Sequence, residues 1–366
     1  MYKCYDCGDW LITENESVEH IIPNAIGGRL KSKKLLCKKC NTKFGETIDA
    51  EFAKQLDTLC ALFSVKRDRN KEYVIKNAIT DKGDRYHLVD GRIPIPVKPT
   101  IEIGENNVYV SARNEKEIKH ILKKLKEKLP TLDLTDVENK LNRHQDFMDE
   151  AVTMNISVGG ETFLKAVAKI AINAYLHFNG KAIYANKAIS FINNKIDNNN
   201  IVHWYYPENS LFFENDEVSH LIHLKGCVTK KILYVYLVLF SAYGFIVNLS
   251  DCYDDAEFCI NYTYDVVKNT KIERSYEIDY NGRLEGDNTI LNRRFIEFIQ
   301  NALDRVLKIS HIQQSKATIS DIAKESVYSV LEKYPEGTVF NEEMSKKIIE
   351  NAAYRIARFL EHLRKK

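Results

Sequence analysis

The sequence predicts an α+β protein in which a small N-terminal lobe precedes a larger mixed region with antiparallel strands and a helical C-terminus. Three observations support this fold class. Two Cys-x-x-Cys pairs within the first 40 residues frame a strand, strand, helix pattern. Residues 72–112 and 201–279 contain short apolar runs typical of strands. Residues 289–364 carry apolar side chains at helical spacing.

Length and composition limit the class of protein. The chain has 366 residues, of which 44% are hydrophobic and 28% are charged, and these values are typical of globular proteins rather than disordered ones. We expect an N-terminal domain at residues 1–57, an α+β region at 58–150 and a C-terminal recognition or regulatory domain at 151–366. The 53 basic and 51 acidic residues nearly cancel, so binding to nucleic acid would require a local basic patch.

Neither an export signal nor a membrane span is predicted. The N-terminal residues contain no apolar stretch typical of a secretory signal, so we expect a cytoplasmic protein without a membrane partner. Residues 232–250 carry no charge over 19 residues, close to the ~20 that a membrane helix needs. Because this stretch is rich in Val, Ile, Tyr and Phe and is interrupted at residues 241–244, we interpret it as two buried strands joined by a tight turn.

The eight cysteines give the first specific signal. Cys4 and Cys7 form one Cys-x-x-Cys pair, Cys37 and Cys40 form a second, and 29 residues separate the pairs. In a reducing compartment such pairs favour a metal over disulfides, and four sulfurs suit tetrahedral Zn²⁺. A small lobe buries little apolar surface, so this zinc would stabilise folding. Because sulfur fills all four positions, the zinc would be structural rather than catalytic.

The segment between and after the cysteine pairs carries polar residues in a defined order. Glu19 and His20 end a predicted strand, and Pro23 with two glycines predicts a turn after it. A second strand is predicted through residues 34–36, and Asn41 is predicted to open a helix. The predicted order is therefore strand, strand, helix around one point.

In this order of residues, the first 57 positions resemble the HNH endonuclease family in its zinc-bound form, the ββα-metal nucleases. The resemblance rests on the four cysteines, on the string EHIIPNAIGG and on LLCKKCNTKFG, and it covers about one sixth of the chain. It implies a zinc-bound ββα domain that hydrolyses phosphodiester bonds with the help of one divalent metal, Mg²⁺ or Mn²⁺.

The resemblance also implies roles for individual residues. His20 matches the general base that activates water, and an ordinary pKa near ~6.5 suits that task. Glu19 matches the acidic metal ligand, and Asn41 matches the second ligand, which lies on the helix and completes an open site for Mg²⁺ or Mn²⁺. Two positions depart from the family pattern: the acidic ligand is usually Asp, and Ser32 stands where the family has its middle Asn.

A run of basic residues borders the predicted metal centre. It contains seven Lys or Arg side chains and no acidic one, and it lies where the phosphate backbone of a nucleic acid would run. The alternative interpretation is an ordinary solvated face. The candidate nucleic-acid-binding residues are Arg29, Lys31, Lys33, Lys34, Lys38, Lys39 and Lys43.

The rest of the chain contains no catalytic motif that we recognise. His220 and His223 lie three residues apart in a predicted strand and therefore on opposite faces, so we interpret them as structural. Residues 106–107 are predicted as a hairpin turn, and residues 131–150 as a polar connection. Predicted helices cover residues 114–129, 161–178, 289–308, 319–333 and 342–364.

The sequence therefore predicts an HNH-type metal-dependent endonuclease that hydrolyses DNA, with RNA left open as a substrate, in the setting of restriction or phage defence. Two alternatives remain. One is a zinc-stabilised nucleic-acid-binding protein that does not cleave, which the departures at Glu19 and Ser32 favour. The other is an effector nuclease activated by a ligand through its C-terminal region. Formation of a homodimer is left open by the sequence.

Overall fold

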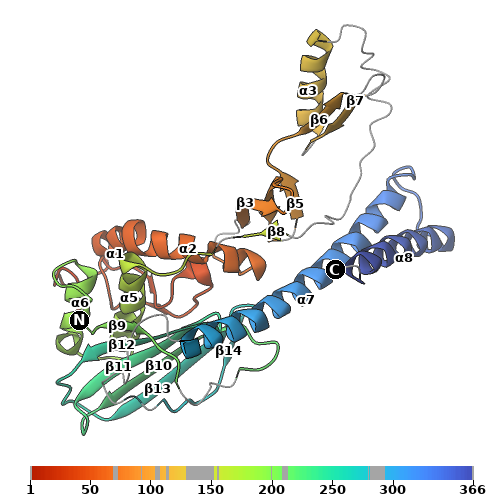
Figure 1. The fold of residues 1–366 in the computed structure, drawn as a ribbon. Helices are drawn as coiled ribbons and strands as arrows, with labels where there is room; N and C mark the ends of the chain where they lie inside the picture. The colour runs from red at the N-terminus through yellow and green to blue at the C-terminus, as the bar shows by residue number, and fades with distance from the viewer. Residues whose placement is uncertain are drawn as a thin grey trace. The chain divides into compact units, whose positions relative to one another are not determined.

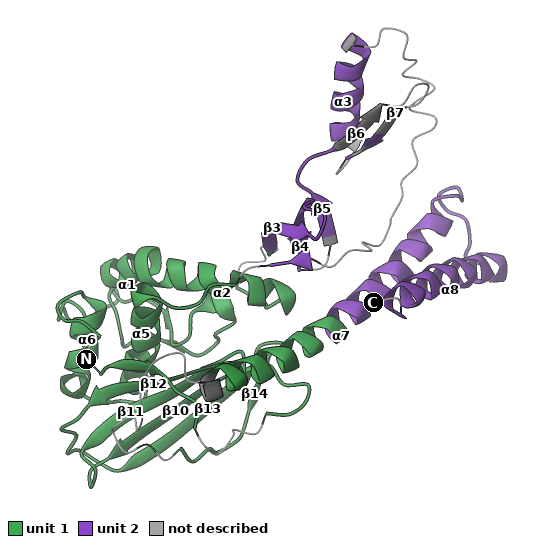
Figure 2. Cartoon of the chain, in the orientation of Figure 1, with its two compact units in different colours: residues 1–73, 156–312 green, residues 74–155, 313–366 purple. Residues whose placement is uncertain are grey.

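The computed structural model describes residues 2–68, 73–91, 93–103, 108–112, 115–128, 152–154, 156–198, 200–207, 213–278, 280 and 293–364. The chain divides into two compact units, each built from two segments (Figure 2). Unit 1 comprises Met1–Tyr73 and Ile156–Ile312, and unit 2 comprises Val74–Asn155 and Gln313–Lys366. The mixed α+β class agrees with the sequence prediction. The units differ from the predicted sequential domains because the chain leaves unit 1 after the N-terminal lobe and returns to it.

The N-terminal lobe of unit 1 begins with a short antiparallel hairpin. Strand β1 (Glu19–His20) pairs with β2 (Lys31–Ser32), with Glu19 opposite Ser32 and His20 opposite Lys31. Between the strands lie the 3-10 turn η1 (Asn24–Ile26) and Gly28, where a Cβ atom would lie 1.8 Å from the Ile22 carbonyl oxygen. Only glycine fits that approach. The predicted second strand at residues 34–36 is wrong, since the pairing places it at Lys31–Ser32 and the next residues bend toward the second cysteine pair.

Helix α1 (Lys38–Phe44), the π-helical segment η2 (Gly45–Asp49) and helix α2 (Ala50–Leu62) follow one another without a break. The helix begins at Lys38 with Cys37 at the N-cap position, so the prediction that Asn41 opens it is wrong. The second Cys-x-x-Cys pair itself forms the first helical turn. The buried face of this helical stretch consists of apolar side chains four residues apart, namely Phe44, Ile48, Phe52 and Leu56.

A six-stranded antiparallel sheet forms the centre of unit 1, in the spatial order β14-β13-β10-β11-β12-β9. The uncharged segment at residues 232–250 forms two paired strands with a tight turn, as predicted. No helix within the described residues is long and apolar enough to cross a membrane. The strands are β9 (Val202–Trp204), β10 (Ser219–Cys227), β11 (Ile232–Leu239), β12 (Tyr243–Ser250), β13 (Phe258–Asp265) and β14 (Thr270–Ile272).

Helix α5 (Glu161–His177) lies between the N-terminal lobe and the sheet (Figure 1). The ring of Phe163 on α5 lies 4.7 Å from that of Phe52 on α2 and 5.8 Å from that of Phe245 on β12, measured between centroids. Twelve of the 17 residues of α5 are buried as a result. The η3 turn (Ala182–Ala185) and helix α6 (Asn186–Ile192) continue this layer against β12.

A buried histidine also ties the sheet to the lobe. The Nε2 atom of His220 on β10 lies 2.8 Å from the carbonyl oxygen of Ile26 in η1, and the Phe240 backbone N–H donates to Nδ1 at 3.2 Å. Burial lowers the pKa of His220 to about 4, so the imidazole is neutral and both ring nitrogens are satisfied. His220 is therefore structural, as the sequence predicted.

Within its described residues, unit 2 has two small antiparallel sheets and two helices, together with the end of a third helix. Its four-stranded sheet has the order β5-β4-β3-β8, and β6 pairs with β7 separately. The predicted turn at residues 106–107 and the connection at 131–150 lie outside the described residues. The elements are β3 (Val74–Thr80), β4 (Arg85–Val89), β5 (Ile93–Pro96), β6 (Thr100–Ile103), β7 (Val108–Ser111), α3 (Glu115–Lys128), β8 (Val152–Thr153) and α8 (Glu342–Arg364).

Helix α7 (Arg293–Leu331) belongs to both units. The sequence predicted two separate helices here, but the residues between them contain neither glycine nor proline, and the helix continues through them. The start of α8 agrees with the prediction, because the Met344 backbone N–H donates to Oδ1 of Asn341 at 3.0 Å.

Candidate functional site

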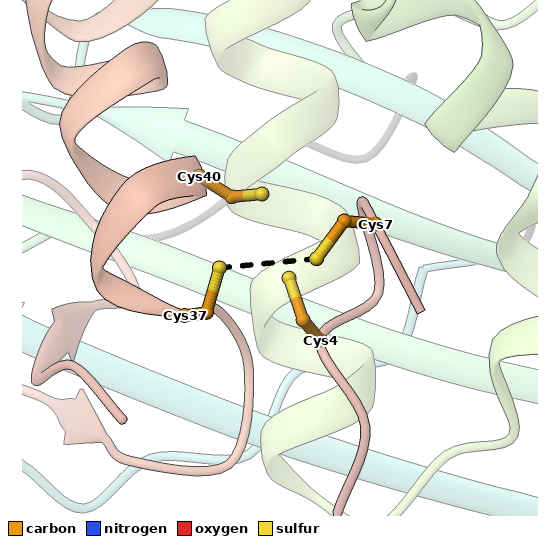
Figure 3. Close-up of side chains that lie close together, drawn as sticks. All are labelled: Cys4, Cys7, Cys37 and Cys40. Atoms are coloured by element: carbon orange, nitrogen blue, oxygen red, sulfur yellow. Dashed lines mark hydrogen bonds between the residues drawn. The ribbon is translucent and has the colours of Figure 1, made fainter. Parts of the chain in front are cut away.

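Four cysteine sulfurs meet at the N-terminal edge of the lobe (Figure 3). Cys4 and Cys7 come from the first loop, whereas Cys37 and Cys40 come from the start of α1, and all four sulfur atoms lie within 4.8 Å of one another. The Cys7 and Cys37 sulfurs are 3.8 Å apart. A tetrahedral zinc with Zn–S bonds of about 2.3 Å would place its sulfurs at about this separation. The cluster therefore fits the structural zinc that the sequence predicted.

Glu19 lies in a buried polar network rather than in open solvent. Its Oε1 atom accepts a hydrogen bond from Nζ of Lys169 at 2.5 Å and from Nδ2 of Asn173 at 3.1 Å, both on α5. Lys169 also donates to Oδ2 of Asp49 at 2.8 Å, and the Tyr5 hydroxyl donates to Asn173 at 3.0 Å. These bonds attach α5 to the lobe at the position where the sequence predicted an acidic metal ligand.

The charges of this network perturb one another. Burial raises the pKa of Glu19, and the Lys169 ammonium only partly opposes that effect. Burial alone would lower the pKa of Lys169, but the carboxylates of Asp49 and Glu19 outweigh it and raise that pKa. Lys169 is therefore charged at neutral pH and stabilises the carboxylate of Glu19. Both hydrogen bonds to Glu19 use Oε1, so Oε2 is the oxygen that remains for a cation.

His20 leaves β1 on the opposite side from Glu19, as neighbouring residues of a strand do. Its Nε2 atom is enclosed, has no hydrogen-bond partner among the described residues, and lies 3.5 Å from Oδ2 of Asp68. Burial lowers the pKa of His20, the Lys31 ammonium lowers it further, and Asp68 opposes the shift. The imidazole is therefore neutral near pH 7, which is the form that accepts a proton.

The charged groups around His20 bond to the carboxylate of Asp68. Its Oδ1 accepts from Nη1 of Arg29 at 2.8 Å and from Nδ2 of Asn24 at 3.2 Å, and its Oδ2 accepts from Nζ of Lys31 at 2.7 Å. The Asp68 backbone N–H also donates to the side-chain oxygen of Asn24 at 2.9 Å. The hydrogen bond from Lys31 lowers the pKa of Asp68, so this carboxylate is ionised at neutral pH.

Asn41 lies on α1 beside the residues that precede β1. Its Nδ2 atom donates to Oγ of Ser17 at 3.2 Å and to the carbonyl oxygen of Val18 at 3.4 Å. Because both bonds use the amide nitrogen, the amide oxygen remains for another donor or a cation. Ser32, in the position of the family's middle Asn, is buried opposite Glu19, and its hydroxyl accepts a hydrogen bond from the Lys34 backbone N–H at 3.2 Å.

The seven basic residues have different partners in the structure. Only Arg29 and Lys31 are brought together beside His20. Others bond to groups elsewhere on the lobe, since Lys33 pairs with Glu16 at 2.7 Å and Lys43 pairs with Asp6 at 2.7 Å. Of the remaining three, Lys34 lies over the Tyr2 ring, Lys38 donates to the Glu14 carbonyl oxygen, and Lys39 is exposed.

Several residues of the site were missed by sequence reasoning. Lys169 and Asn173 had a detectable signal, because with Lys165 they form a polar stripe spaced by four residues along an otherwise apolar helix. Asp49 and Asp68 had none, since an acidic residue on a helix or in a loop is usually only solvated. Asp68 also lies beyond the part of the chain that carries the family resemblance.

The hairpin and the following helix define a ββα domain with a histidine at the end of its first strand and a four-thiol cluster that fits zinc. Residues 4–57 match the family model described as HNH endonuclease, so this domain is a member of that family. An endonuclease acts on nucleic acid, so this match implies a nucleic-acid substrate. No curated protein and no solved structure shows significant similarity to this chain.

Proposed function

We propose that this protein is a metal-dependent endonuclease that hydrolyses phosphodiester bonds in DNA at His20. The observation that carries the proposal is the position of His20, at the end of β1 in a domain of the HNH family, beside Asp68 and the cations of Arg29 and Lys31 that pair with it. A base and two cations within one small area are what hydrolysis of an anionic diester requires.

In the proposed reaction His20 takes a proton from a water molecule. Its Nε2 atom, which lies 3.5 Å from Oδ2 of Asp68, is the nitrogen next to the position that the phosphate takes when Asp68 withdraws. The water oxygen forms a bond to phosphorus as the bond from phosphorus to the 3′ oxygen breaks. Arg29 and Lys31 stabilise the negative charge that increases on the non-bridging oxygens, provided that they exchange Asp68 for the phosphate.

A bound Mg²⁺ or Mn²⁺ would add charge stabilisation at the scissile phosphate and the leaving oxygen. The family resemblance assigns Glu19 and Asn41 to hold it, and hard cations prefer such oxygen ligands, although Glu19 is engaged by Lys169 and Asn173 and leaves β1 on the opposite side from His20. The Lys169 ammonium, 2.5 Å from Oε1 of Glu19, repels a second cation there. We therefore propose weak binding of the catalytic metal, in contrast to tight binding of the zinc.

The experiment that tests the proposal is incubation of supercoiled plasmid with the full chain in Mg²⁺, Mn²⁺ or EDTA. We expect nicked or linear DNA with either metal and none with EDTA, under chelation mild enough to leave the zinc in place. Single-stranded DNA and RNA in the same assay define the substrate. Intact plasmid under every metal condition, with a folded and zinc-loaded protein, would refute the proposal.

The buried ion pair between Lys169 and Glu19 favours a second candidate, a nucleic-acid-binding protein that does not cleave. In that case the ammonium replaces the catalytic metal permanently. This candidate predicts salt-dependent binding of duplex DNA without cleavage under every divalent metal. For either candidate we propose a role in restriction or phage defence, by analogy with stand-alone proteins of similar domain layout.

A further inference from the structure

The carboxylate of Asp68 lies between groups that commonly bind phosphate. A guanidinium, an ammonium and an amide converge on its two oxygens, from Arg29 at 2.8 Å, Lys31 at 2.7 Å and Asn24 at 3.2 Å. The imidazole of His20 lies 3.5 Å away. Arginine and lysine side chains that meet on one oxyanion form a site for carboxylate or phosphate alike.

The segment that supplies Asp68 is held by this site. Nη2 of Arg29 donates to the carbonyl oxygen of Lys66 at 2.9 Å, and the Asp68 backbone N–H donates to the side chain of Asn24. The Asp68 side chain is 42% exposed, so solvent and a larger anion can reach it. Asp68 also follows helix α2 and lies outside the residues that match the family.

We propose that the Asp68 carboxylate occupies the position of a nucleic-acid phosphate and that residues 66–68 must withdraw before substrate binds. This inference rests on the proposed function, and it assigns Arg29, Lys31 and Asn24 as the phosphate site and Asp68 as its internal competitor. A positioning role for Asp68 on His20 is less favoured, because the 3.5 Å contact is much longer than the bonds to Arg29 and Lys31.

The proposal predicts that removing the competing charge strengthens DNA binding. We would measure binding of the full chain to a fluorescein-labelled 20-base-pair duplex by anisotropy, in EDTA and over a range of salt. Asp68→Asn keeps the oxygen that Asn24 and Arg29 contact but loses the charge. We expect it to bind about 3- to 10-fold more tightly at low salt, with a steeper dependence on salt, because two cations then reach phosphates.

Two further variants isolate the site. Glu46→Gln removes one exposed acidic charge from η2 of the same lobe, away from residues 66–68, and is expected to leave affinity nearly unchanged. Arg29→Gln in the Asp68→Asn background is expected to return the affinity to the wild-type level or below it. Zinc content and circular dichroism confirm that each variant is folded.

The outcomes separate this inference from the proposed function. Tighter binding by Asp68→Asn supports the inference even if neither protein cuts DNA. Unchanged or weaker binding, including no binding by either protein, overturns it even if the wild-type protein cuts. Slower cleavage by Asp68→Asn at unchanged affinity would instead show that Asp68 positions His20.

Discussion

Lys169 is a buried cation with two anionic partners, and it connects α5 to the N-terminal lobe. Its side chain is 2% exposed, and its ammonium contacts both Glu19 and Asp49. Burying these charges costs free energy that their mutual attraction and hydrogen bonds must offset. We infer that the network determines the orientation of α5 more than it adds to stability. It sets which residues of α5 face the lobe, and it places a positive charge beside Glu19.

Replacement of Lys169 by methionine is predicted to destabilise unit 1. Lys169→Met leaves the buried carboxylates of Glu19 and Asp49 without their cation, so the free energy of unfolding should fall by about 3–5 kcal/mol. Denaturant unfolding followed by circular dichroism measures the change. The matched control is Lys187→Met, because its contact with Asp251 is more exposed and should contribute less than about 1 kcal/mol. Equal stability of the Lys169 variant and the wild type would contradict the assigned network.

The pKa of His20 sets a pH dependence for cleavage. Burial lowers that pKa, so protonation removes the base only below its ordinary value of about 6.5. We expect kcat/KM, which reports the free enzyme, to be constant above pH 7 and to fall as the pH drops below about 6.5. The rate of plasmid nicking from pH 5 to 8.5 measures this dependence. A midpoint well above 7 would mean that another group is the base.

The sequence predicted the residues that belong to a motif with fixed spacing. It did not predict which residues contact them. The cysteine cluster followed from spacing alone, since two Cys-x-x-Cys turns can approach one ion. The partners of Glu19 and His20 could not be inferred, because they come from residues far away in the chain, at Lys169 and Asp68. Only the fold brings such residues together.

At the scale of elements, the predicted helices and strands mostly exist, but their ends were misplaced where the tertiary structure determines them. The helix begins at Lys38 rather than at Asn41 because the turn that carries the second cysteine pair is already helical. The second strand moved to Lys31–Ser32 because pairing with β1 fixes its register. Helix α7 is one helix rather than the two predicted, because the residues in its middle include neither glycine nor proline.

The cysteine cluster joins the N-terminal loop to α1, so loss of zinc should affect this element first. Cys40→Ser removes one of the four ligands, and metal binding is coupled to folding. We expect about one zinc per chain in the wild-type protein by elemental analysis and less in the variant. The variant should also show a lower Tm and loss of any cleavage. Cys60→Ser changes a buried cysteine outside the cluster and should retain its zinc. Disulfides at the cluster would contradict the assignment.

At the scale of the whole molecule, the HNH domain is not an appended module. Its hairpin, its helix and its turn contact α5 and the central sheet through Glu19, Phe52 and Ile26. Sequence periodicity predicted the class of this large region but not its contribution to the site. Lys169 shows that contribution directly, because a residue 150 positions away contacts the predicted metal ligand.

The role of His20 in cleavage is the central claim of this account. The most direct measurement compares the single-turnover rate of DNA cleavage by the wild type and His20→Ala at equal zinc content and equal DNA affinity. We predict a loss of at least about 100-fold in the variant, which is the usual contribution of a general base. A His20→Ala protein that cleaves as fast as the wild type would contradict the account.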